Sequence, residues 1–122
     1  MRALVPLALL ALPAAALSQD APRTVEVQLS SFDFTPQTIR LRAGRPVLLH
    51  LVNSGSGGHN FAAPQFFAAA TGVSGPVVGG KVEVPGHQSV DVLLTPARGR
   101  YRLRCTHTLH STFGLRGEIL VE

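Results

Sequence analysis

Residues 101–122, YRLRCTHTLHSTFGLRGEILVE, close this 122-residue chain and decide its fold. In the first part of the stretch, arginines alternate with Tyr101, Leu103 and Cys105, and residues 117–122 alternate in the same way. A period of two predicts β-strands with one buried face, so Cys105 should point into the core, while Ile119 and Val121 face inward on the last strand. The two strands, joined by a loop, predict a hairpin.

The arginines of the first strand should face solvent. In the predicted hairpin, Arg102 and Arg104 can face the outward Glu118 and Glu122. We therefore interpret this face as solvated and charge-balanced, in preference to a dedicated binding surface. The formal net charge of +4 does not point to nucleic acid, and it favours encounters with an acidic partner instead.

The rest of the chain repeats the same kind of segment. Short runs rich in Val, Leu and Ile lie between Pro, Gly and Ser, which predicts an all-β antiparallel sandwich or small barrel. Residues 47–53 form the most apolar run and should be a central strand covered on both faces, followed by a flexible loop over 53–58. Further strands are expected at 25–29, 39–41, 81–84, 89–94, 99–106 and 117–122, with one short helix at 64–70.

The N-terminus has the order of a secretory signal peptide. Met1 and Arg2 precede an apolar run over residues 3–17, and the polar Ser18, Gln19 and Asp20 follow. The run of about fifteen residues is too short to cross a bilayer, which needs about twenty. We predict a cleaved signal peptide at residues 1–18, a single mature domain at 19–122, and a periplasmic or secreted protein.

The only cysteine has two histidines nearby in the sequence. Cys105 has no second cysteine in the chain with which to form a disulfide, although export exposes it to oxidising conditions. Four residues separate Cys105 from His110. His59 directly follows two glycines that come after the expected central strand. A Cys and two His in one plane form the geometry of a blue copper site. His107 is an alternative ligand because it would share the face of Cys105 if the strand continued.

Other uses of these residues remain open at this point. Cys105 could be a plain buried hydrophobe, or a nucleophile with His107 or His110 as its base. An inward strand cysteine leaves little room for a substrate, and no orienting acid is evident, so we do not predict an enzyme. His50 and His87 are interpreted as structural, and Phe61, Phe66, Phe67 and Phe113 as packing around the site.

Three segments resemble the cupredoxins, the small blue copper proteins that include plastocyanin and azurin. They are FDFTPQTIRLRAGRPVLLHLVN at 32–53, GHNF at 58–61 and YRLRCTHTLHSTFGLRGEILV at 101–121. The resemblance implies a Greek-key β-sandwich of about eight strands and single-electron transfer. It also implies that one copper ion is bound by His59, Cys105 and His110.

The sequence departs from this family at the axial position. Small electron carriers usually have methionine there, whereas this chain has Leu115, and its only methionine is Met1. Leucine cannot coordinate copper, so a raised reduction potential is expected. Zinc would be poorly served by the same donors, because its tetrahedral preference needs a fourth ligand. Asn60 and Thr106, each directly after an expected ligand, should orient the site from just outside it.

Multicopper oxidases share the C-terminal motif, but they carry a histidine after the cysteine. This chain has Thr106 there and five histidines in all, too few for a trinuclear cluster. We expect a monomeric electron carrier whose partner is a redox protein such as a cytochrome or oxidase. The alternative is a periplasmic copper-sequestering or copper-delivery protein for copper tolerance, with a copper-handling partner, because the same ligands serve both functions.

Overall fold

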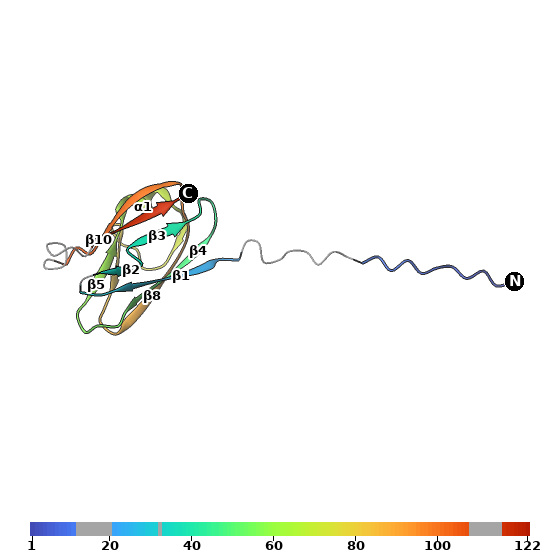
Figure 1. Ribbon diagram of the computed structural model, residues 1–122, viewed down its shortest axis with the longest axis horizontal. Coiled ribbons are helices and arrows are strands. Elements are labelled where there is room, and N and C mark those ends of the chain that lie inside the picture. The colour runs from blue at the N-terminus through green and yellow to red at the C-terminus, as the bar shows by residue number, and fades with distance from the viewer. Residues whose placement is uncertain (12–20, 32, 108–115) are drawn as a thin grey trace.

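Two β-sheets and one short helix make up the body of the protein. The computed structural model describes residues 1–11, 21–31, 33–107 and 116–122. Figure 1 shows the strands of both sheets gathered into one body. The strands are β1 (Arg23–Leu29), β2 (Phe34–Thr35), β3 (Thr38–Leu41), β4 (Val47–Asn53), β5 (His59–Ala62), β6 (Thr71–Ser74), β7 (Lys81–Val84), β8 (Gln88–Thr95), β9 (Gly99–Arg104) and β10 (Arg116–Val121), and the helix is α1 (Pro64–Ala69).

The predicted all-β sandwich with one short helix is confirmed. One sheet has the order β2-β1-β4-β8-β6, and the other has the order β3-β10-β9-β5-β7. The hairpin of β9 and β10 is antiparallel as predicted, but the β1–β4 and β3–β10 pairs are parallel. The purely antiparallel prediction was wrong. β3 belongs to the second sheet, whereas β2 and β4, which precede and follow it in the sequence, belong to the first. The chain therefore crosses the sandwich twice there.

Ten strands occur among the described residues, against the expected eight or so. The sequence did not predict β2, β5 or β6. β2 has two residues, all four residues of β5 are buried, and all four residues of β6 are exposed, so none of them shows alternation. β9 ends at Arg104, which places Cys105 just beyond the strand end. The helix ends at Ala69, one residue earlier than predicted.

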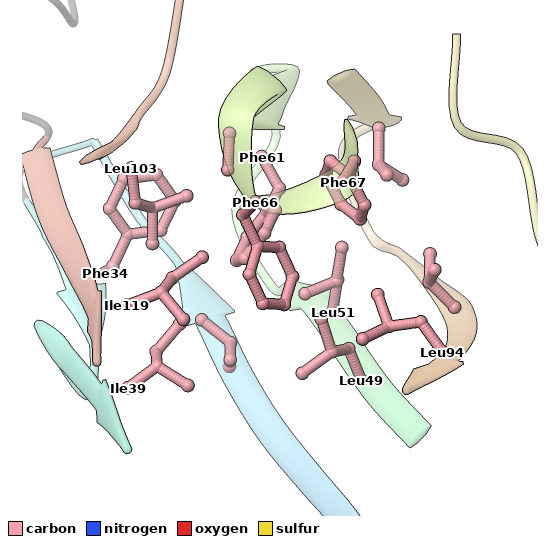
Figure 2. Packing of buried hydrophobic residues seen from close by; sticks show 14 of the residues in the cluster. Phe34, Ile39, Leu49, Leu51, Phe61, Phe66, Phe67, Leu94, Leu103 and Ile119 are labelled. Atoms are coloured by element: carbon pink, nitrogen blue, oxygen red, sulfur yellow. The ribbon is translucent and has the colours of Figure 1, made fainter. Parts of the chain in front are cut away.

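The core lies between the sheets and is filled by aliphatic and aromatic side chains. Figure 2 shows Phe66 with Leu49 and Leu51 of β4 on one side, and with Phe34 of β2 and Ile119 of β10 on the other. Phe66 is fully buried, and burying a Phe side chain contributes about 1.5–3 kcal/mol. The helix begins with Pro64 in its first turn, where a missing N–H costs nothing, and directs its two phenylalanines into the core.

Aromatic edges meet near the candidate site. Phe61 of β5 contacts Phe34 and Phe67 edge to face, with ring centroids 6.1 Å and 5.9 Å away. Phe66 contacts Tyr101 of β9 in the same manner at 5.5 Å. Phe113 lies outside the described residues, so its predicted packing remains a prediction.

The central position of β4 is confirmed, but its second face is only half covered. Val47, Leu49, Leu51 and Asn53 are buried, whereas the residues between them are of intermediate exposure. The prediction of two covered faces was therefore wrong, because the sandwich has only two layers. Across the described ranges, we find no helix with the length and apolar character that a membrane span requires.

Candidate metal centre

Cys105 and the start of β5 lie side by side. The pairing of Ala62 with Arg104 sets the register between β5 and β9. Two residues further along, the backbone N–H of Asn60 donates to Cys105 Sγ at 3.3 Å. His59 and Cys105 are both buried, with 2% and 0% exposure. Two residues predicted as ligands from distant parts of the sequence thus occupy neighbouring, water-excluded positions.

The side chain of Asn60 connects this strand to the residue after the cysteine. Its Nδ2 donates to Thr106 Oγ1 at 2.7 Å, and its Oδ1 accepts from the Thr106 backbone N–H at 2.8 Å. Asn60 is 1% exposed, so these bonds form away from bulk water. The reciprocal pair fixes the spacing between His59 and Cys105, since each neighbours one of the two bonded residues.

Glu83 of the edge strand β7 is a third member of this network, and the sequence analysis missed it. Glu83 Oε1 accepts from Asn60 Nδ2 at 3.0 Å, and Oε2 lies 3.1 Å from His107 Nε2. The Asn60 hydrogen bond is the main cause that lowers the pKa of Glu83, and His107 adds to it. Glu83 is opposite Asn60 in the β5–β7 pair. The sequence analysis could not find this pairing because it did not predict β5.

His107 is half-exposed and belongs to the outer side of this network. Its side chain is 40% exposed, and its Nε2 lies within hydrogen-bond distance of the Glu83 carboxylate. Gly58 lies close by, since a Cβ there would be 3.8 Å from His107 Cε1. Its assignment as an alternative ligand remains a prediction.

The loop before His59 is held by a second buried amide. Asn53 Nδ2 donates to the carbonyls of Gly57 at 2.8 Å and Val84 at 3.0 Å, and its Oδ1 accepts from Gly55 N–H at 3.1 Å. Gly86 packs against the same loop, where an added Cβ would meet the Ser56 carbonyl oxygen at 2.2 Å. The segment predicted as a flexible loop thus has several fixed points just ahead of His59.

Two histidines lie away from this centre. His50 Nδ1 contacts Asp91 Oδ1 at 2.5 Å across the β4–β8 pair of the other sheet. His87 is exposed in a turn and has a φ of 58°. Among the hydrogen bonds of the described residues, neither histidine is linked to Cys105, Asn60 or Thr106, and the structural roles expected for them remain predictions.

His110 and Leu115 lie outside the described residues, so their predicted roles are untested. Within residues 1–11, 21–31, 33–107 and 116–122, no three His, Cys, Asp or Glu side chains form a metal-binding group. The chemistry of the described part suits a thiolate ligand, because a buried sulfur that accepts a backbone N–H has the environment that tunes such a ligand. The described residues therefore fit a metal centre with Cys105 as a thiolate donor, and the remaining donors stay predictions.

Comparison with known proteins identifies the family of this chain. A family model described as a cupredoxin-like domain matches residues 2–121. The structure of auracyanin B matches with a TM-score of 0.61 and 25% identity, over 82% of this chain and 88% of that chain. Auracyanin A, a "blue" copper protein from the green thermophilic photosynthetic bacterium Chloroflexus aurantiacus, has a TM-score of 0.60 at 17% identity, over 83% and 99%.

A larger enzyme shares the fold over part of its length. The McoA multicopper oxidase from the hyperthermophile Aquifex aeolicus matches with a TM-score of 0.66 and 14% identity, over 84% of this chain and 30% of that chain. A search of curated proteins found no match. Because these two identities are low, the matches to auracyanin A and the oxidase show a shared fold alone.

Proposed function

Because the chain belongs to the cupredoxin-like domain family, we propose that it is an exported type 1 copper protein that transfers single electrons. One copper ion is bound by His59, Cys105 and His110. The observation that carries this proposal is the buried Cys105 sulfur, which accepts the backbone N–H of the residue directly after His59. Copper held there supplies a one-electron couple.

The protein's contribution is to hold two donors in place. Asn60 and Thr106 tie the strand of His59 to the residue after Cys105, and Glu83 braces Asn60 from the edge strand. Phe61 and its aromatic neighbours keep water from this end of the core. A fixed, dry donor set changes little between oxidation states, which suits electron transfer.

His110 is a better candidate than His107 for the third copper ligand, beside His59 and Cys105. The Nε2 atom of His107 already lies 3.1 Å from the Glu83 carboxylate, and this ring is half-exposed. His110 matches the spacing of the family motif. Leu115 would not donate to the metal, so His59, Cys105 and His110 would be its ligands.

Residues 1–18 are the signal peptide in this proposal, and the monomeric domain at 19–122 works in the periplasm or outside the cell with a redox protein partner. No catalytic residue is assigned. A copper-delivery or copper-sequestering role uses the same donors. However, the hydrogen bonds of Asn60 with Thr106 and Glu83, which we call the clamp, favour a protein that keeps its metal. The rate of copper transfer to a chelator separates the two, since a delivery protein releases its ion readily.

The test is copper binding and colour in the purified mature protein. We expect one copper per chain and an intense thiolate-to-Cu(II) absorption in the visible. Cys105→Ser should abolish the band, whereas His50→Ala, a matched control on the other sheet, should keep it. A wild-type protein without copper, or a Cys105→Ser protein that stays blue, would show that the proposal is wrong.

A further inference from the structure

A cavity of about 230 Å³ lies at the end of the sandwich that is opposite Cys105. Its lining comes from both sheets, because Val47 begins β4 and Leu41 ends β3. Leu41 is opposite Val121, which is opposite Gly99 at the start of β9. Gly99 precedes Cys105 by six residues, which cover roughly 20 Å at the rise of a strand. The cavity is therefore separate from the candidate metal centre.

Three arginines surround this cavity. Arg23 begins β1, and Arg42 and Arg45 lie in the connection between β3 and β4. All three are exposed, and we call them the arginine rim. The inner lining is apolar, because Leu41 and Val47 are only 4% and 3% exposed. The cavity thus combines a cationic mouth with a dry inner wall, where an anion would be less screened than on an open surface.

Backbone contacts hold the arginine rim in place. Arg23 Nη2 donates to the carbonyl of Arg40 in the other sheet at 3.3 Å, so this guanidinium crosses the end of the sandwich. The backbone N–H of Arg45 donates to the Arg42 carbonyl at 3.3 Å and closes a tight turn. Gly44 within this turn has a φ of 76°, a conformation that glycine adopts without strain. The rim is therefore partly organised before any ligand binds.

The acidic residues of the described structure leave this cavity positively charged. No Asp or Glu among the described residues lines it, and within the same ranges the arginine rim forms no ion pair. Glu122 contacts Arg40 at 3.6 Å, although the sequence analysis expected it to face the arginines of β9. Asp20 precedes the lining residue Ala21 but lies outside the described residues. Like charges gathered around one hollow repel one another, and such a local conflict is expected at a functional site.

We propose that this cavity binds a phosphate group, supplied by a soluble phosphate ester or by the headgroup of an anionic phospholipid. A planar guanidinium donates two parallel hydrogen bonds to a phosphate, and the negative charge relieves the repulsion within the arginine rim. The preformed turn lowers the freedom that is lost on binding. A lipid headgroup bound here would turn the Cys105 end of the sandwich away from the membrane. This inference does not depend on the metal.

The test is a titration of the purified mature protein with inorganic phosphate, followed by NMR of the backbone amides. Reducing conditions keep any copper as diamagnetic Cu(I), and chloride holds the ionic strength at about 0.1 M, where distant exposed charges are screened. We expect saturable shifts centred on residues 41–47. Arg45→Gln should weaken phosphate binding by about tenfold, the loss expected for one hydrogen bond between charged groups. Arg42→Gln should act in the same direction and replaces Arg45→Gln if that variant fails to fold.

Arg102→Gln is the matched control, because it removes the same charge from an exposed arginine outside the cavity. Arg102 lies on β9 opposite Glu118 and does not line the cavity. Its variant should bind phosphate as tightly as the wild type does.

Vesicles distinguish the two sources of the phosphate group. Vesicles of phosphatidylglycerol mixed with phosphatidylcholine should retain the wild type and Arg102→Gln, but not Arg45→Gln, if a lipid headgroup is the ligand. Inorganic phosphate should then release the bound protein, and vesicles of phosphatidylcholine alone should not retain it. Phosphate binding without retention on either vesicle would assign the cavity to a soluble phosphate ester.

Two results would overturn the proposal. The absence of saturable shifts at residues 41–47 would show that the arginine rim is only a solvated surface or is neutralised by another part of the chain, such as Asp20. Equal weakening by Arg102→Gln and Arg45→Gln would show that net charge alone attracts the anion. Neither result changes the blue band expected for the copper protein, so the proposed function stands or fails separately.

Discussion

The buried amides of Asn60 and Asn53 offer a matched pair of perturbations beside the candidate site. Each is 1% exposed, and each makes three hydrogen bonds through its side chain. Asn60 bonds to Thr106 and Glu83 across the candidate centre, whereas Asn53 bonds to Gly55, Gly57 and Val84 within and behind the loop. Replacing either by alanine removes the same number of bonds from the same depth.

The expected loss of stability follows from this count. A protein hydrogen bond contributes about 1 kcal/mol net, so each variant should lose about 3 kcal/mol of unfolding free energy. For a domain of about 100 residues, this corresponds to a fall of roughly 12–24 °C in Tm. Typical domains have an unfolding free energy of about 5–15 kcal/mol, so both variants should still fold at low temperature. Urea unfolding of the metal-free proteins measures the loss.

Only Asn60→Ala should disturb the copper centre. It removes the acceptor of the Thr106 backbone N–H beside Cys105, whereas the backbone N–H of residue 60 still donates to the Cys105 sulfur. Loss of such an orienting partner typically weakens metal binding by about 10–100-fold, so copper transfer to a chelator should accelerate by at least about tenfold. The visible band should also shift. If Asn53→Ala releases copper as fast as Asn60→Ala, general destabilisation explains the effect and the clamp has no special role.

Further predictions concern the metal ligands and pH. His110→Ala should disrupt the blue absorption severely while His107→Ala leaves it nearly intact, and the reverse ranking of the two spectra would make His107 the ligand. Leu115→Met should keep the protein folded and blue but lower its reduction potential, because a thioether stabilises Cu(II); electrochemistry showing an unchanged or higher potential would remove Leu115 from the axial position. Glu83 has a folded pKa below its ordinary 4.5, so its contribution to stability is present above that value and lost as the pH falls through the folded pKa. Urea titrations of the metal-free protein should therefore show wild type losing more stability than Glu83→Gln as the pH falls below about 4.5, and parallel losses would contradict this.

The sequence was most informative where burial alternates. In β9 and β10, Leu103, Ile119 and Val121 alternate with exposed or half-exposed residues, so the hairpin and its inward face could be predicted. The ligand motifs predicted that Cys105 and His59 lie close together, and the backbone N–H of Asn60, next to His59, donates to the Cys105 sulfur. The cupredoxin resemblance rested on the same motifs and is confirmed by the family match.

Pairings that depend on register could not be predicted in this way. Alternation shows which face Arg104 occupies, but its partner depends on how the loop between the strands closes, and here that partner is Arg116. Glu83 looks like any exposed strand residue in KVEV, and its role appears only when β7 pairs with β5. Short strands such as β5 escape detection because four buried residues carry no period.

The arrangement of these contacts bears on whether copper is carried or delivered. Asn60 of β5 is hydrogen-bonded to Glu83 of β7 and to Thr106, which follows the end of β9. These bonds link the strand of His59 to the residue after Cys105 through protein groups. A centre whose donors are already placed loses little conformational freedom on binding, which favours slow release. Slow release suits a protein that cycles its copper between oxidation states and works against one that must hand the ion to a partner. The same clamp therefore favours electron transfer over copper delivery, and the chelator experiment on Asn60→Ala measures how much of that retention the clamp provides.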